Sequence, residues 1–275
     1  MSFSKNPILM KEHIFHHILQ FRRMIPGASA IQRYLNRRQY MSLPREVFGI
    51  NFRNPLGLSG MDHNGEFFNQ LSDFGFGFVS TGPFSTKDSR SAILSAVKTI
   101  RSAPVRTVLA VTLSRDPSHT SDEDILEDYR TPFTLLYDFV DMAIVDMYAP
   151  EPEFITDILD ELLSLRLCYE SHLPILLRIP RKLQGKALEQ TLDFAMLSGI
   201  DGLIMTGLEG VKIARKITKE RLPVIGSMMK KTPEEASAML DLGADLIEVD
   251  GEMADNCIRL PRTIMKYLSN HQVKP

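Results

Sequence analysis

The 275 residues can bury a single hydrophobic core, and 44% hydrophobic against 24% charged residues is typical of a soluble globular protein. A net charge of −2 gives no indication of nucleic-acid binding. The two cysteines, Cys168 and Cys257, lack metal-site spacing, and the sequence has no run of eighteen apolar residues. We therefore expect a protein of the reducing cytoplasm that holds no metal and is neither exported nor membrane-spanning. Both cysteines fall in helix-like stretches, where a thiol usually serves as a small apolar filler.

Residues 1–46 form a basic segment, with eight Lys and Arg residues against two Glu residues. Apolar residues at helical spacing predict two short amphipathic helices, at residues 13–24 and 31–38, separated by Pro26-Gly27. Two interpretations remain open. The helices either cap the rest of the protein or lie on the inner face of a membrane with basic side chains toward phospholipid: Arg22, Arg23, Arg33, Arg37 and Arg38.

Residues 47–275 alternate short apolar runs with amphipathic stretches of helical length. The runs are mostly apolar on both faces, as expected of strands buried between a barrel interior and a layer of helices. They lie at Pro55–Ser59, Phe76–Gly82, Thr107–Leu113, Phe139–Asp146, Pro174–Ile179, Gly202–Thr206, Leu222–Gly226 and Asp245–Asp250. The order predicts an α/β fold, a (β/α)8 TIM barrel over residues 47–275 that follows the helical extension of residues 1–46.

Two of the intervening helices have clear signals. Residues 152–169 place apolar side chains at helical spacing, with acidic residues near the start. After Gly226, Thr232 is followed by Pro233 and by Glu at the capping-box position, so we expect a helix to begin there.

Four phrases carry a family resemblance. Residues 47–66 read VFGINFRNPLGLSGMDHNGE, residues 75–79 read GFGFV, and residues 201–204 and 223–226 read DGLI and PVIG. In order and spacing these phrases are similar to the first, second, sixth and seventh strands of the dihydroorotate dehydrogenases. The paired helices before the barrel resemble the quinone-linked, membrane-associated class of that family.

The resemblance implies FMN-dependent oxidation of dihydroorotate to orotate in pyrimidine biosynthesis, with a quinone reoxidising the flavin. Such a reaction needs a base for the C5 proton, groups that fix the substrate and backbone amides that hold the flavin phosphate. The sequence departs from the family at the positions of the base, of the groups that fix substrate and flavin, and of the phosphate-binding amides.

The catalytic base is the first departure. The family's membrane-associated class has Asn-x-x-Ser-Pro-Asn-Thr after the fourth strand, and this chain has residues 146–152, DMYAPEP. Ala149 stands at the position of the catalytic serine, and Asp146 and Glu151 replace two asparagines that contact substrate. Carboxylates at contact distance would repel an anionic orotate.

The flavin site is the second departure. By resemblance the cofactor-binding positions are Ser59, Gly60, His63, Thr112, Asp146, Arg178, Thr206 and Gly226. His63 replaces a lysine that contacts the cofactor and supplies no dependable charge near neutral pH. Arg178 replaces a second lysine, and Thr112 an asparagine.

The phosphate site is the third departure. The family's Gly-x-Gly-Gly turn after the seventh strand is here Gly226-Ser227-Met228-Met229, so two thioether side chains occupy positions that glycine keeps open. Thr206, after the sixth strand, runs almost directly into a helix. The regions after the second and fourth strands are also shorter than in the family.

Three hypotheses follow. The first is a diverged family member that no longer oxidises dihydroorotate. The second is an enzyme with a changed small-molecule substrate at a polar barrel mouth formed by Asp62, His63, Arg115, Asp146, Arg178 and Asp250. The third is a still active dihydroorotate dehydrogenase. We interpret His119 as structural or incidental.

Overall fold

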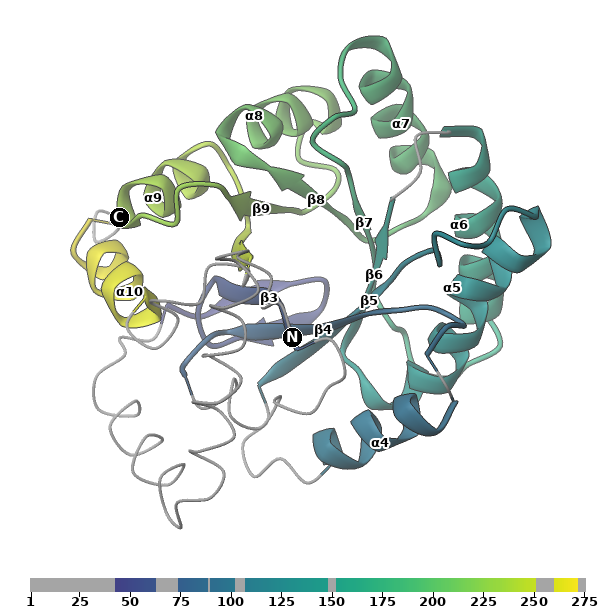
Figure 1. Cartoon of the computed structure of the whole chain (residues 1–275). Helices are drawn as coiled ribbons and strands as arrows, with labels where there is room; N and C mark the ends of the chain where they lie inside the picture. Colours follow the sequence, from purple (N-terminus) through teal and green to yellow (C-terminus); the bar gives the residue numbers. More distant parts are fainter. Residues whose placement is uncertain are drawn as a thin grey trace, which may run out of the picture.

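The computed structural model describes residues 43–62, 74–88, 90–101, 107–147, 152–250 and 260–271. Within these ranges, eight parallel strands close into a barrel in the order β10-β3-β4-β5-β6-β7-β8-β9 (Figure 1). They are β3 (Leu56–Asp62), β4 (Phe78–Phe84), β5 (Val108–Leu113), β6 (Met142–Asp146), β7 (Ile175–Arg178), β8 (Gly202–Thr206), β9 (Val224–Met228) and β10 (Leu246–Asp250). The predicted TIM barrel is confirmed.

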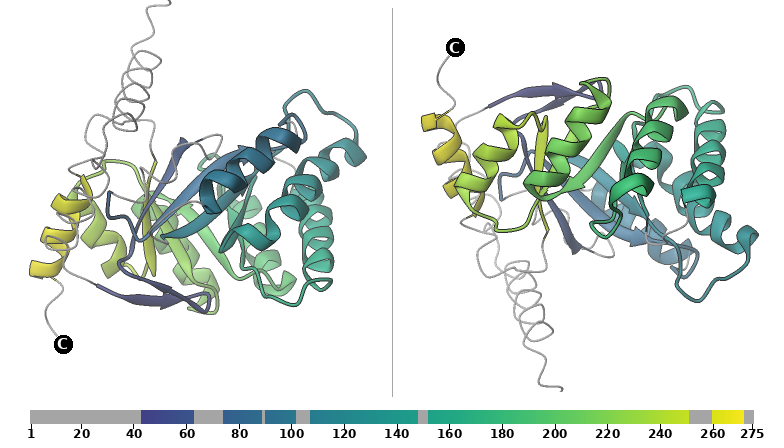
Figure 2. Two further views of the ribbon diagram at one scale, coloured as in Figure 1. Left: turned by 90° about the horizontal axis from the view of Figure 1, so that it is seen from below. Right: turned by 90° about the horizontal axis from the view of Figure 1, so that it is seen from above.

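Helices surround the barrel wall on its outer side (Figures 1 and 2). They are α4 (Arg90–Arg101), α5 (Asp122–Leu136), α6 (Pro152–Arg166), α7 (Gly185–Ser198), α8 (Gly207–Thr218), α9 (Pro233–Asp241) and α10 (Leu260–His271). A 3-10 turn, Tyr137–Phe139, takes up the start of the apolar run predicted to lead β6. No helix of the described ranges is long and apolar enough to span a membrane.

The predicted start of α9 is confirmed, because the Thr232 side chain accepts a hydrogen bond from the backbone N–H of Glu235 and Pro233 opens the helix. The prediction for Cys168 is wrong. Helix α6 ends at Arg166, so Cys168 lies beyond its end and is exposed. Cys257 and the two helices predicted within residues 1–42 lie outside the described residues.

Strand side chains alternate between two cores. One core fills the space between the strands and the helices, and the other fills the barrel interior. The interior members are Phe78, Ala110, Met142, Ile144, Leu176, Ile204, Ile225 and Leu246. Gly57 makes room for the Phe78 ring, since a Cβ atom at residue 57 would lie 2.0 Å from it.

A short hairpin closes the amino-terminal end of the barrel (Figure 2). Strands β1 (Arg45–Val47) and β2 (Ile50–Phe52) are joined by Phe48 and Gly49, both with positive φ, as two-residue hairpin turns require. Val47 and Phe52 belong to the interior core, where the Phe52 ring meets Phe78 edge to face at 5.8 Å. Strand β1 runs across the predicted boundary between residues 46 and 47.

Candidate active site at the barrel mouth

The carboxyl ends of the strands place a layer of polar side chains inside the barrel. Each lies two residues after Gly57 or a residue of the interior core and therefore points inward. The layer consists of Ser59, Ser80, Thr112, Asp146, Arg178, Thr206, Ser227 and Glu248. Barrel enzymes carry their chemistry at this end. The structure thus brings together Ser59, Thr112, Asp146, Arg178 and Thr206 of the predicted positions.

A buried ion pair crosses this layer. Arg178 on β7 donates from Nη1 to Glu248 Oε1 at 2.7 Å and from Nη2 to Oε2 at 3.3 Å. Glu248, on β10, is fully buried. Glu248 was not among the predicted positions, although an acid in the middle of the apolar run of β10 was the available signal. Its carboxylate accepts hydrogen bonds from both terminal nitrogens of the Arg178 guanidinium, so the charge of Arg178 is already paired.

Asp146 is the second carboxylate of the mouth. It lies beside Arg178 in the strand register. Burial raises the pKa of its carboxyl, nearby Glu248 raises it further, and Arg178 opposes both. The Tyr129 hydroxyl donates to the backbone carbonyl of Asp146, but within the described residues the Asp146 carboxylate has no hydrogen-bond donor.

Other polar atoms of the layer differ in their partners. Ser80 and Thr112 share a hydrogen bond of 2.7 Å, which engages the hydroxyl at the predicted cofactor position 112. The buried atoms Ser59 Oγ and Arg178 Nε have no partner in the described part of the chain. Since buried polar groups are normally hydrogen-bonded, these two atoms could meet water or a ligand. Gly60, next to Ser59, has φ +71° where the register of β3 and β4 shifts.

The loop after β9 holds a further acid. Glu235, in the first turn of α9, accepts backbone hydrogen bonds from Met229 at 3.0 Å, Lys230 at 2.6 Å and Lys231 at 2.9 Å. It therefore binds three N–H groups before the N-cap residue rather than that of Thr232, the partner that a capping box would give it.

The glycine and methionines of this loop serve packing. Gly226 faces the helix layer, where an added Cβ atom would lie 2.8 Å from Met239 Sδ. Met228 is buried in the same layer, and Met229 is 42% exposed. The Met229 sulfur lies over Gly207 at the start of α8, 2.9 Å from the place of a Cβ atom there.

A cavity of about 470 Å³ opens beside this contact, between the loops after β7 and β8. Its lining includes Arg181, Gln184, Thr206, Gly207 and Met229. Thr206, predicted as a cofactor position, thus lies between the mouth and this cavity.

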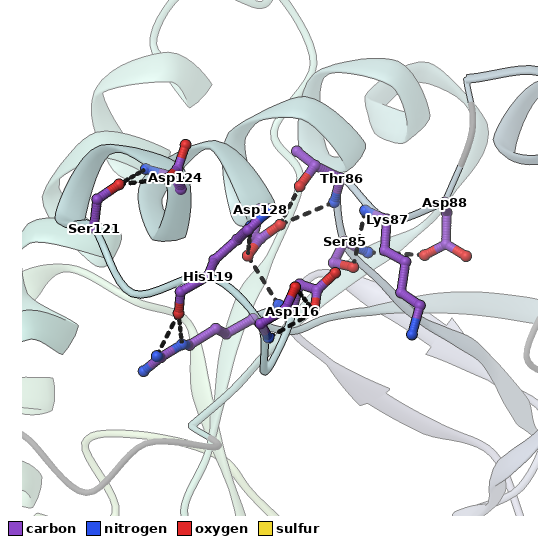
Figure 3. Close-up of polar contacts among 11 residues, drawn as sticks. Ser85, Thr86, Lys87, Asp88, Asp116, His119, Ser121, Asp124 and Asp128 are labelled. Atoms are coloured by element: carbon purple, nitrogen blue, oxygen red, sulfur yellow. Dashed lines mark hydrogen bonds and ion pairs between the residues drawn. The ribbon is translucent and has the colours of Figure 1, made fainter.

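A separate polar cluster joins the loops after β4 and β5 (Figure 3). Fully buried Asp128 of α5 accepts from the backbone N–H of Thr86 at 3.1 Å and of Asp116 at 2.8 Å, and from the Thr86 hydroxyl. His119 Nδ1 lies 3.0 Å from the same carboxylate. This hydrogen bond raises the pKa of His119, against a smaller effect of burial. The contacts support the structural interpretation of His119.

Several predicted residues are not part of this geometry. Arg115 donates to the backbone carbonyl of His119 at 3.1 Å, which ties its guanidinium to the cluster of Asp128. His63, Ala149 and Glu151 lie outside the described residues. Asp250 ends β10 beside Ser59, and its carbonyl accepts a hydrogen bond from Lys231 Nζ.

Comparison with curated proteins supports the family resemblance. The chain is similar to the dihydroorotate dehydrogenase (quinone) of Christiangramia forsetii, with 26% identity over 88% of this chain and 91% of the relative. The protein of the same name from Idiomarina loihiensis is 24% identical over 76% of this chain and 82% of its own length. The first alignment extends over 309 positions, more than the 275 residues of this chain, so the relative carries insertions. No family model matches the sequence.

Solved structures show the same fold. A ligand-free DHODH from Eimeria tenella superposes with a TM-score of 0.75 at 17% identity, over 89% of this chain and 94% of that chain. A mandelate oxidase variant with 2-hydroxy-phenylacetamide superposes with a TM-score of 0.57 at 9% identity, over 89% and 86% of the two chains. The resemblance to the quinone-linked dihydroorotate dehydrogenases is therefore confirmed over most of the chain, in sequence and in architecture.

Proposed function

We propose that this dihydroorotate dehydrogenase-like barrel has lost the FMN-dependent oxidation of dihydroorotate to orotate. The observation that carries the proposal is the ion pair of Arg178 with Glu248. The resemblance assigns Arg178 to a cofactor contact, but a buried carboxylate already neutralises its guanidinium. Asp146 lies beside Arg178, so the described part of the mouth has two acids, Asp146 and Glu248, around this arginine. An anionic dihydroorotate would be repelled there.

Two further features support loss of the reaction. Ala149 stands at the position of the catalytic serine, and a methyl group cannot remove the C5 proton. The backbone amide of Met229, the last residue of the turn where the resemblance would place the flavin phosphate, already donates to Glu235. These residues do not fit FMN as the family binds it.

The test uses purified full-length protein. We expect no visible absorption of bound flavin, no saturable binding of added FMN and no quinone reduction with dihydroorotate. A yellow protein that reduces a soluble quinone with dihydroorotate would overturn the proposal and establish the third hypothesis, a still active enzyme. The Ala149→Ser variant, assayed in the same way, shows whether the missing hydroxyl alone blocks the reaction.

A second candidate function is an enzyme with a different small substrate. The observation in its favour is the Asp146 carboxylate, which has a raised pKa and faces a mouth where Ser59 Oγ and Arg178 Nε have no partner in the described residues. The excess of acids favours a neutral or cationic ligand that donates hydrogen bonds. We would screen amines, amidines and polyols by thermal shift on the wild type and on Asp146→Asn. Equal shifts on both proteins would exclude a role for Asp146.

For the basic amino-terminal segment, the proposed place of action is the cytoplasmic face of a membrane. Its net charge is the supporting observation. Full-length protein should co-sediment with anionic vesicles, whereas a chain that begins at Leu43, and so retains β1, should remain in solution. Equal sedimentation of both chains would favour simple capping of the barrel.

A further inference from the structure

The cavity of about 470 Å³ beside the mouth lies between helices α7 and α8, which are neighbours on the outer side of the barrel (Figure 1). Its apolar floor belongs to the core between strands and helices, not to the barrel interior. Ile179, Leu188 and Met205 form part of this floor, and each is at most 5% exposed. The cavity is therefore separate from the polar layer of the mouth, and its volume is in the range of small-molecule sites.

The two connections that border the cavity are short. After β7, the backbone N–H of Leu183 donates to the carbonyl of Pro180 at 2.9 Å, and this turn includes Arg181. After β8 there is no intervening loop, because Gly207, with φ +74°, begins α8 directly after Thr206. Neither connection has residues left to fold over the cavity, so the space stays open to solvent.

The rim of the cavity exposes apolar side chains. Leu208 and Met229 both line it, and they are 36% and 42% exposed, among the few large hydrophobic side chains at the surface of the described ranges. Exposed apolar side chains that gather at one concave place mark a binding site, whereas scattered ones need no explanation. In the described part of the chain no aromatic side chain lines the cavity, so its walls favour an aliphatic body over a stacked ring.

Two opposite charges also line the cavity. Arg181 belongs to the turn after β7 and Glu209 to the first turn of α8, and both are exposed. Neither side chain has an ion pair or hydrogen bond within the described residues. Gln184, which precedes α7, makes no capping hydrogen bond with its amide. An unpaired guanidinium and an unpaired carboxylate at one cavity complement a ligand with one negative and one positive group, rather than a simple anion or cation.

We infer that the cavity between α7 and α8 binds a small aliphatic zwitterion, an α-amino acid with a branched aliphatic side chain. The ligand carboxylate pairs with Arg181, the ammonium group pairs with Glu209, and the aliphatic side chain packs on the floor beneath Leu208 and Met229. Met229 suits this role, since its flexible thioether lies over bare Gly207 and can adapt to a ligand. The inference goes beyond the proposed function and does not depend on it, because the cavity lies outside the barrel interior.

Isothermal titration calorimetry of the full-length protein tests the class of ligand. L-leucine has all three features, whereas 4-methylpentanoate lacks the ammonium group, 3-methylbutylamine lacks the carboxylate and glycine lacks the aliphatic body. We expect L-leucine to bind with a Kd below about 1 mM and each comparison ligand to bind at least about tenfold more weakly. Absence of saturable L-leucine binding, or a comparison ligand that binds as tightly, would overturn the inference.

Variants of the rim locate the site. Arg181→Met and Glu209→Gln each remove one charge at an exposed position, where substitution preserves the fold, and each should weaken L-leucine binding at least about tenfold. Lys182→Met is the matched control and should bind as the wild type does, since Lys182 is an exposed cation beside Arg181 that does not line the cavity. Unchanged affinity in R181M and E209Q, or loss of binding in Asp146→Asn instead, would place the ligand elsewhere and contradict the inference.

Discussion

The charged side chains at the barrel mouth lose contact with water, and this cost is offset only where they pair with one another. The Arg178–Glu248 pair removes two charges from water, and its geometry, with two hydrogen bonds, offsets much of the cost. Asp146 adds a carboxylate that the same arginine does not contact. A mouth of this kind tolerates neutral and cationic ligands better than anions.

Removal of one partner of the buried pair should be strongly destabilising. Arg178→Met leaves Glu248 charged and unpaired, and we expect a loss of about 3–5 kcal/mol in the free energy of unfolding. The double variant with Glu248→Leu should recover most of this loss, since no buried charge remains at either position. Urea unfolding measures both. Arg181→Met, at an exposed cation on the following loop, is the control and should change stability by less than about 0.5 kcal/mol.

Asp146 predicts a pH effect of defined sign. Because its pKa is raised in the folded state, the stability linked to its protonation is present below the ordinary value of 3.8 and is lost as pH rises through the raised pKa. The Tm of the wild type relative to Asp146→Asn should therefore fall as pH rises from about 4 toward neutrality. A constant difference across this range would show that the carboxyl is not perturbed.

Between elements, the cluster of Asp128 joins helix α5 to two loops at the active end of the barrel. The loops after β4 and β5 are held by backbone N–H groups on one carboxylate, with His119 as an additional partner. Asp128 therefore ties both loops to helix α5, in addition to the backbone hydrogen bond from Ser114 to Phe84 at the ends of the two strands.

His119 should make that attachment pH-sensitive. Its raised pKa means that the stabilisation is fully present below the ordinary value of 6.5 and is lost as pH rises through the higher folded value. We expect the Tm of the wild type to approach that of His119→Asn as pH increases above about 6.5. His271→Gln, at the exposed end of α10, is the histidine control outside the cluster of Asp128. A gap between wild type and H119N that widens with pH would reverse the assigned sign.

Two glycines should respond in opposite directions to alanine. A methyl group at Gly57 would meet the Phe78 ring inside the closed barrel, and we expect Gly57→Ala to cost about 3 kcal/mol. At Gly210 in α8 the nearest atom would lie at 3.5 Å, an ordinary contact, so Gly210→Ala should stabilise by about 0.5–1 kcal/mol. Chemical denaturation of both variants tests the pair, and destabilisation by Gly210→Ala would contradict the packing described for α8.

The elements could be predicted from sequence because local signals specify them. Strands buried on both faces read as apolar runs, and Thr232 with Pro233 marks a helix start without any tertiary information. The run before β6 was placed too early, because Phe139 ends a 3-10 turn.

The site was less predictable, since its contacts join distant positions. Arg178 and Glu248 are 70 residues apart and meet only when the barrel closes. Glu235 was recognised as a capping residue, but its three backbone partners depend on the left-handed turn at Lys231. Motif positions indicate where chemistry occurs, whereas pairing across the barrel decides which charges remain available.

At the scale of the whole molecule, the two ends of the barrel differ in chemistry. The hairpin places Val47 and Phe52 against the interior core at one end, while the opposite end carries the polar layer. A ligand of the mouth must therefore enter and leave through the loops that follow the strands.

The hairpin can complete its packing only late in synthesis. Residues 45–52 leave the ribosome early, yet their apolar side chains pack with Ile225 and Leu246, which are made late. Strand β3 likewise lacks one of its two neighbours until β10 is made, because the pairing of β3 with β10 closes the barrel. A nascent chain lacking the last strand therefore exposes both an open sheet edge and an unseated aromatic hairpin, a state in which chaperones would recognise it.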